Sequence, residues 1–196
     1  AVNEFLDSHN IVKVRNVQEN IRSLYEVDAT KYEKDSNKTL LIRRIYNMIP
    51  SQLENKKKRI IIKDIQNKIG DRFDNYLEEF EYLISSGTAL EVSAISNPKY
   101  PLAESAHKNL MKLYLNDVGL LTMLLYKNSI RPVISDEDSV NLGSVYESVV
   151  AQELKAHGHK LFYYDNKQRG EVDFLIDDYS STTILPIEVK SGKDYT

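Results

Sequence analysis

The sequence predicts a mixed α/β (α+β) protein, and two patterns support this prediction. Apolar residues recur at helical spacing over residues 36–50 and 71–87, and an almost wholly apolar helix is expected over 118–126. Another helix is expected over 143–157, and three short apolar runs with the length of strands follow it, at 160–164, 171–176 and 183–189. A helix followed by strands that return to one sheet is typical of an α/β core.

Residues 36–116 have the element order of a winged helix. Ser36 and Asp71 are expected to cap two helices, the first of which ends at Pro50. Two strands are expected to follow these helices, at 89–95 and 112–116. Helices followed by a pair of strands predict a winged-helix-like part ahead of the α/β core.

The composition excludes several classes of protein. Hydrophobic residues make up 41% and charged residues 28% of the chain, an ordinary globular balance. Cysteine is absent, which excludes disulfide scaffolds and thiolate metal sites and fits a reducing cytosol, so a cytoplasmic protein is expected. No apolar run approaches the roughly 20 residues that cross a bilayer, so no membrane contact is expected. The net charge is −3, so any nucleic-acid surface must come from a local basic patch.

Residues 51–72 contain such a patch, with seven positive and three negative charges. The helix that would enter the major groove, over 71–81, has the opposite character, because five acidic residues accompany the single Arg72. Phosphates would repel that helix. We therefore expect a structural or protein-contact role for the winged helix. The basic run Lys56 to Arg59 is either a peripheral phosphate contact or a surface cluster that binds nothing.

The last predicted strand carries the residues with the clearest chemical potential. Side chains alternate along a strand, so Glu188 and Lys190 lie on one face, and Asp173 on a neighbouring strand can place a second carboxylate beside Glu188. Two carboxylates, a backbone carbonyl and waters are suitable ligands for Mg²⁺. Lys190 would orient the attacking water or stabilise the transition state, and Glu147 would add a second-shell or second-metal contact.

An ordinary ion pair would explain the same pattern. An acidic residue stands two positions before a lysine at several places in the chain, and only the pair Glu188 and Lys190 lies in an apolar strand. A cross-strand ion pair on a solvated face would contribute about 0.2–1 kcal/mol to stability. On the pattern alone this is the commoner outcome, and both interpretations stay open.

The chain from Gly143 to Gly192 resembles the PD-(D/E)XK nuclease superfamily. More closely, it resembles the nuclease-like C-terminal domain that follows a P-loop AAA-type ATPase in many prokaryotic proteins of uncertain function. The stretches that carry the resemblance are Met48-Ile-Pro-Ser-Gln-Leu53, Lys112-Leu-Tyr-Leu-Asn-Asp-Val-Gly-Leu-Leu121, Tyr146-Glu147, Glu171-Val-Asp173-Phe and Pro186-Ile-Glu-Val-Lys-Ser-Gly192. The nuclease motif of that family falls on Asp173, Glu188 and Lys190, and its helix acid on Glu147. Val172 stands where the name of the superfamily has Pro, at a variable position.

The resemblance implies three segments: a helical lead-in from an upstream ATPase domain, the winged-helix-like domain, and a restriction-endonuclease-like α/β core, at 1–35, 36–116 and 117–196. The chain contains no Gly-x-x-x-x-Gly-Lys-Ser/Thr loop, so ATP is expected only in the upstream domain. Both ends of the chain look cut, and part of the nuclease-like fold is expected to lie beyond Gly192.

The sequence is therefore compatible with two functions. The first is the C-terminal region of an AAA-type ATPase that cleaves DNA with Mg²⁺, held by Asp173, Glu188 and Glu147. The second is a non-catalytic regulatory or docking module that keeps the fold and its charged pocket. DNA and the upstream ATPase domain of the same chain are the expected partners, and an oligomer is compatible with the sequence.

Overall fold

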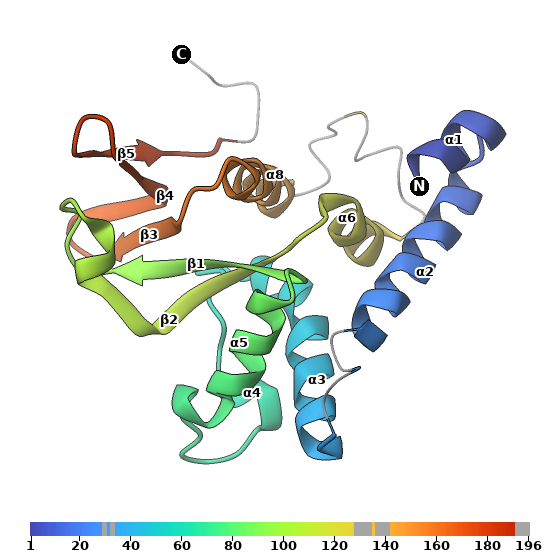
Figure 1. Ribbon diagram of the computed structural model, residues 1–196, viewed down its shortest axis with the longest axis horizontal. Coiled ribbons are helices and arrows are strands. Elements are labelled where there is room, and N and C mark those ends of the chain that lie inside the picture. The colour runs from blue at the N-terminus through green and yellow to red at the C-terminus, as the bar shows by residue number, and fades with distance from the viewer. Residues whose placement is uncertain (29–30, 32–33, 128–134, 136–141, 191–196) are drawn as a thin grey trace.

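The computed structural model describes residues 1–28, 31, 34–127, 135 and 142–190. Within these ranges the protein is a mixed α+β structure built on one five-stranded sheet with the strand order β2-β1-β3-β4-β5 (Figure 1). The mixed α+β class predicted from the sequence is confirmed. No helix in the described ranges is long and apolar enough to span a membrane.

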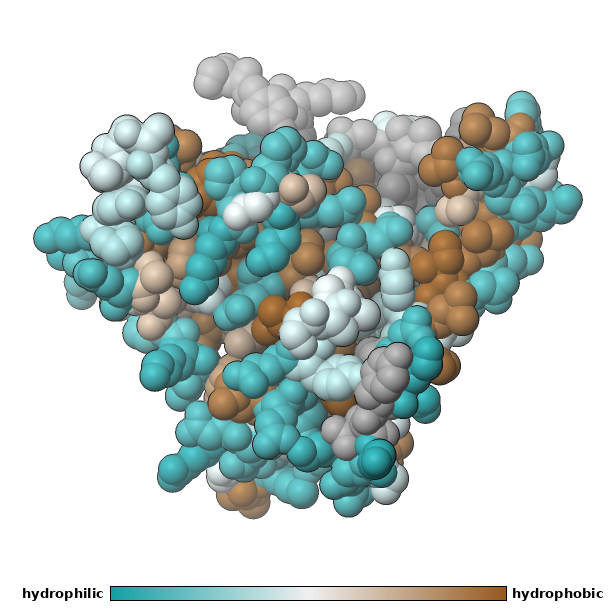
Figure 2. All heavy atoms as spheres, in the orientation of Figure 1, coloured by the Kyte–Doolittle hydropathy of each residue, from teal (hydrophilic) through white to brown (hydrophobic). Residues whose placement is uncertain are grey.

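Helices make up the N-terminal part. They are α1 (Val2–Ser8), α2 (Ile11–Asp28), α3 (Ser36–Leu53), the short α4 (Lys63–Gln66) and α5 (Leu77–Ser85). Figure 2 shows apolar side chains gathered over α1 and α2, where Phe5, Leu6 and Leu24 are among the exposed large residues.

Two helix boundaries differ from the prediction. Asp35 caps α3, because its side chain accepts a hydrogen bond from the N–H of Asn37, and the helix continues past Pro50 as far as Leu53. Leu53 is completely buried, so core packing favours the last turn despite the proline.

The carboxylate of Asp71 does not cap α5. It accepts hydrogen bonds from the Tyr76 hydroxyl and the Asn75 amide, and a 3₁₀ turn, Phe73–Tyr76, precedes the helix.

The sheet joins strands from both ends of the chain. β1 (Ala89–Ile95) pairs antiparallel with β2 (Ala106–Leu115) and parallel with β3 (Leu161–Asn166). β3, β4 (Gly170–Asp178) and β5 (Thr183–Ile187) form an antiparallel run. β2 begins earlier than predicted, because its first half is mostly exposed and polar and shows no apolar alternation. The predicted domain boundaries stay a prediction, but the sheet itself continues across residue 117.

Helices cover both sides of β1 and β2. In Figure 1, α3 and α5 lie below these strands and α8 (Gly143–Ala156) lies above them. The apolar helix α6 (Val118–Tyr126), predicted with these bounds, contacts α2 on one side and α8 on the other. One large core therefore runs from α3 through the sheet to α8, and it includes residues of both the N-terminal and the C-terminal parts.

Candidate active-site cleft

A cleft of about 320 Å³ opens beside the first turns of α8. Residues from α8, β4, the chain that leaves β5, and the segment after α3 line it: Lys56, Lys58, Gly143, Glu147, Glu171, Asp173, Glu188, Val189 and Lys190. All four side chains predicted from the sequence (Glu147, Asp173, Glu188 and Lys190) thus lie around a single cleft. Ser191 and Gly192 of the last motif lie outside the described residues.

Asp173 reaches from β4 to the point where β5 ends at Ile187. Its Oδ2 accepts a hydrogen bond of 2.8 Å from the Val189 N–H. The Asp173 side chain thus bonds the chain just beyond Ile187, where the backbone pairing between β4 and β5 stops. Burial raises the pKa of the Asp173 carboxyl above its usual value, the bond from Val189 lowers it, and the charges of Glu147 and Glu188 raise it. A bound cation would therefore favour the ionised form of this carboxyl group.

Glu147 is held on both of its oxygens. The side chain is only 6% exposed, and its Oε2 accepts a hydrogen bond of 2.9 Å from the hydroxyl of Tyr114 in β2. Its Oε1 forms an ion pair with the ammonium group of Lys58. Both partners come from the N-terminal part of the chain, so Glu147 is fixed by residues remote in sequence.

Glu188 and Lys190 stand at the open rim of the cleft. They form an ion pair of 2.5 Å with each other, with exposed side-chain fractions of 46% and 63%. The hydrogen bond that Lys190 donates to Glu188 raises the pKa of Lys190. β5 ends at Ile187, so the two residues lie just beyond the strand in which the sequence placed them, and their ion pair brings them together. An exposed pair of this kind contributes little to stability.

Lys112 lies beneath the cleft, and the sequence did not identify it as a site residue. Its side chain is 1% exposed, its Nζ lies 3.9 Å from Glu171 Oε1 and 4.8 Å from the centre of the Tyr163 ring, and it makes no hydrogen bond to any described residue. Burial lowers the pKa of Lys112, whereas the charges of Glu147, Glu171 and Asp173 raise it. The sequence signal was a lysine within the otherwise apolar second half of the strand, Leu110 to Leu115.

Residues 54–59, which we call the basic loop, connect the N-terminal helices to the cleft. Their polar contacts with the C-terminal part include Lys58 with Glu147, Lys57 with Asp165 at 3.5 Å, Arg59 with Asp165 at 3.6 Å, and Glu54 with the Ser144 hydroxyl. The sequence predicted only that this basic run is peripheral or inert. The structure instead places one of its lysines, Lys58, in the cleft.

The cleft offers part of a metal-binding set. No group of three or more acidic or histidine side chains in the described ranges is arranged to hold a metal ion. Asp173 and Glu188 line the same cleft, and Mg²⁺ takes one or two carboxylates together with several waters. Two carboxylates with waters are the kind of donor set that one hard divalent cation accepts. The oxygens of Glu147 already have protein partners, so its role as a metal ligand stays a prediction.

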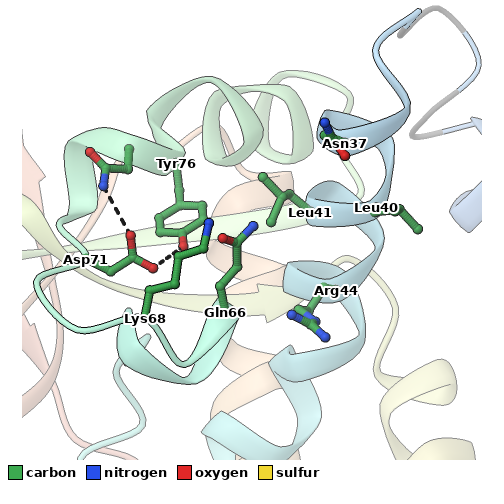
Figure 3. A pocket seen from close by; sticks show the side chains of 9 residues that line it. Asn37, Leu40, Leu41, Arg44, Gln66, Lys68, Asp71 and Tyr76 are labelled. Atoms are coloured by element: carbon green, nitrogen blue, oxygen red, sulfur yellow. Dashed lines mark hydrogen bonds between the residues drawn. The ribbon is translucent and has the colours of Figure 1, made fainter.

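A second hollow, of about 600 Å³, lies between α3 and the segment before α5 (Figure 3). Its polar groups mostly satisfy one another. Asp71 accepts a hydrogen bond from Tyr76, and Arg44 donates to the backbone carbonyl of Ile65 at 2.8 Å. The cleft at Asp173 brings together acidic and basic side chains from several elements, so it is the better candidate for a functional site.

Comparison with known families divides the chain in two. The family described as Domain of unknown function (DUF4143) matches residues 142–196, which include the acidic residues of the cleft. Searches of curated proteins and of solved structures found no match. The family described as Domain of unknown function (DUF8612) matches residues 1–131, which include Lys58, Lys112 and Tyr114. Because this second match covers more than half of the chain, the protein belongs to the DUF8612 family.

Proposed function

We propose that this chain is the C-terminal region of an AAA-type ATPase and that its cleft cleaves DNA phosphodiester bonds with Mg²⁺. One observation carries the proposal: Glu147, Asp173, Glu188 and Lys190 come from three separate segments and line a single cleft. A surface ion pair would require only Glu188 and Lys190. The helix α8 followed by the antiparallel strands β3, β4 and β5 also supports a PD-(D/E)XK-like core, and α3 to α5 followed by β1 and β2 support a winged-helix-like part.

Each group in the cleft has a distinct part in this chemistry. Asp173 and Glu188 would hold the cation, which would polarise the phosphodiester and supply a reactive water. Lys190, at the rim, would stabilise the negative charge that develops on the phosphate. The bond from the Val189 N–H keeps Asp173 aimed at the end of β5, so the carboxylate is positioned before any ligand arrives.

Cleavage of supercoiled plasmid DNA by the purified protein tests the proposal. We expect nicking with Mg²⁺ or Mn²⁺, and a loss of about 10²–10³ in rate for Asp173→Ala and for Lys190→Ala, because each removes a preorganised group. Lys167→Ala, an exposed lysine elsewhere in the C-terminal part, is the matched control and should cleave at the wild-type rate.

The melting temperature provides a second readout. Asp173→Ala should keep or raise the melting temperature of the metal-free protein, because it removes a half-buried carboxylate that Glu147 and Glu188 repel. Cleavage that persists in both variants would place the activity elsewhere or in a contaminant.

A second function is supported by the contacts of Glu147. Because Lys58 and Tyr114 occupy both of its oxygens, the cleft is partly neutralised from within, as expected for a non-catalytic docking module. The same plasmid assay separates the two functions, since a docking module would leave the DNA intact with every divalent metal.

A further inference from the structure

Lys58 reaches the cleft through a constrained backbone. The loop turns on a hydrogen bond of 3.0 Å from the Lys58 N–H to the Asn55 carbonyl, and Lys58 has a φ of 50°, in the left-handed region that a residue with a side chain rarely adopts. Its neighbours Lys57 and Arg59 both pair with Asp165. Because the loop is held on both sides of Lys58, the ammonium group is fixed toward Glu147 instead of sampling solvent.

The ammonium group of Lys58 lies against the Glu147 carboxylate, the kind of group that holds metal ions in hydrolytic sites. Hydrolytic sites with two metal ions use carboxylates to hold a second cation about 3.5–4 Å from the first. Glu147 lines the same cleft as Asp173 and Glu188, but Lys58 takes one of its oxygens and Tyr114 takes the other. A second divalent ion could bind at Glu147 only after it displaced Lys58.

The charges around the cleft agree with a single ion. The groups that line it or lie beneath it are four acidic side chains and four lysines: Glu147, Glu171, Asp173, Glu188, Lys56, Lys58, Lys112 and Lys190. One divalent ion together with one phosphodiester would leave an excess of a single positive charge. Two ions would leave an excess of three, next to the buried and unsolvated ammonium of Lys112.

We propose that Lys58 is the fixed second cation of this cleft: it replaces a second metal ion beside Glu147, so that the cleft takes one divalent ion and Lys58 supplies the other positive charge to the substrate phosphate. This inference rests on the proposed metal-dependent function and specifies its metal count. It also makes the cleft composite, because the residues 142–196 provide the carboxylates and residues 1–131 provide the cation.

Mn²⁺ titration followed by electron paramagnetic resonance tests the inference without reference to activity. Wild type should bind one Mn²⁺ per chain, and Lys58→Met should bind two, because the freed Glu147 carboxylate becomes a ligand. Lys63→Met is the matched control: it removes an exposed lysine of α4, which does not line the cleft, and should still bind one.

A double variant keeps the test valid if Lys58→Met folds poorly. Lys58→Met leaves the buried Glu147 without its cation, whereas Lys58→Met/Glu147→Gln removes that charge as well. The double variant should fold and bind one Mn²⁺. The inference would be overturned if wild type bound two Mn²⁺ ions or none. It would also be overturned if the double variant bound two ions, or if a folded Lys58→Met protein bound only one. If wild type binds one Mn²⁺ but leaves DNA intact, the proposed nuclease function fails while the metal count stands.

Discussion

The hydrogen bond between Tyr114 and Glu147 provides the sharpest test of how the cleft is held together. Tyr114 is fully buried and the side chain of Glu147 is only 6% exposed, so water cannot replace the bond of 2.9 Å between them when it is lost. Burial raises the pKa of Tyr114 well above its usual value, so the hydroxyl keeps its proton and donates throughout the neutral range. Tyr114→Phe removes that donor and leaves the ring that packs in the core.

The expected cost follows from the kind of bond. A hydrogen bond to a charged group contributes about 1.5–3 kcal/mol, and the acceptor left behind stays buried with only Lys58 as a partner. Tyr46→Phe is the matched control, because the Tyr46 hydroxyl is also buried but has no hydrogen-bond partner among the described residues. Deleting an unsatisfied buried hydroxyl should change the free energy of unfolding little or raise it slightly.

Urea denaturation of wild type, Tyr114→Phe and Tyr46→Phe at pH 7 measures the difference. Tyr114→Phe should lower the free energy of unfolding by about 1.5–3 kcal/mol more than Tyr46→Phe does. A double-mutant cycle with Glu147→Gln then isolates the pairwise term. Equal stability of the two phenylalanine variants would refute the assignment of Tyr114 as the residue that holds Glu147.

Two further variants test the surroundings of the cleft. Burial lowers the pKa of Lys112 from 10.5, so between that lowered pKa and 10.5 the unfolded chain binds more protons than the folded one. The free energy of unfolding of wild type should therefore rise relative to that of Lys112→Met as the pH approaches 10.5. Urea denaturation at pH 7 and pH 10 measures this change, and a fall in place of the rise would contradict the argument. Asp117→Ala should lower the free energy of unfolding by about 0.5–2 kcal/mol, because the Asp117 side chain caps α6 through the N–H groups of Gly119 and Leu120; thermal melting that matches wild type would show that the cap is dispensable.

Local patterns in the sequence predicted the bounds of helices and strands better than the pairing of strands in the sheet. The bounds of α6 and β1 were predicted as the structure has them, because apolar composition and flanking polar residues mark both clearly. The parallel pairing of β1 with β3 was not predicted. Alternation tells which side chains share a face, but it does not say which remote strand will lie alongside.

In the candidate site, too, the residues marked by a local pattern were predicted and those brought in by long-range contacts were not. Asp173, Glu188 and Lys190 were predicted because strand alternation and a known motif mark them together. Lys58 and Tyr114 were missed as site residues, since they meet Glu147 across 89 and 33 positions of the chain. A basic run has a strong signature in the sequence, but the direction of one lysine within it depends on the fold of the loop.

These contacts bear on which part of the chain is the functional unit. Without the N-terminal part, β3 would lose the pairing of Val92 to Ile95 with Leu161 to Tyr164, and the edge strand exposed in this way would carry buried aromatic residues. Glu147 would lose both the hydroxyl and the ammonium group that satisfy it. A C-terminal fragment would therefore present a different cleft, with a free carboxylate and no fixed cation. Metal binding or cleavage measured on such a fragment would report the behaviour of that altered cleft, so the two family regions have to be tested as one unit.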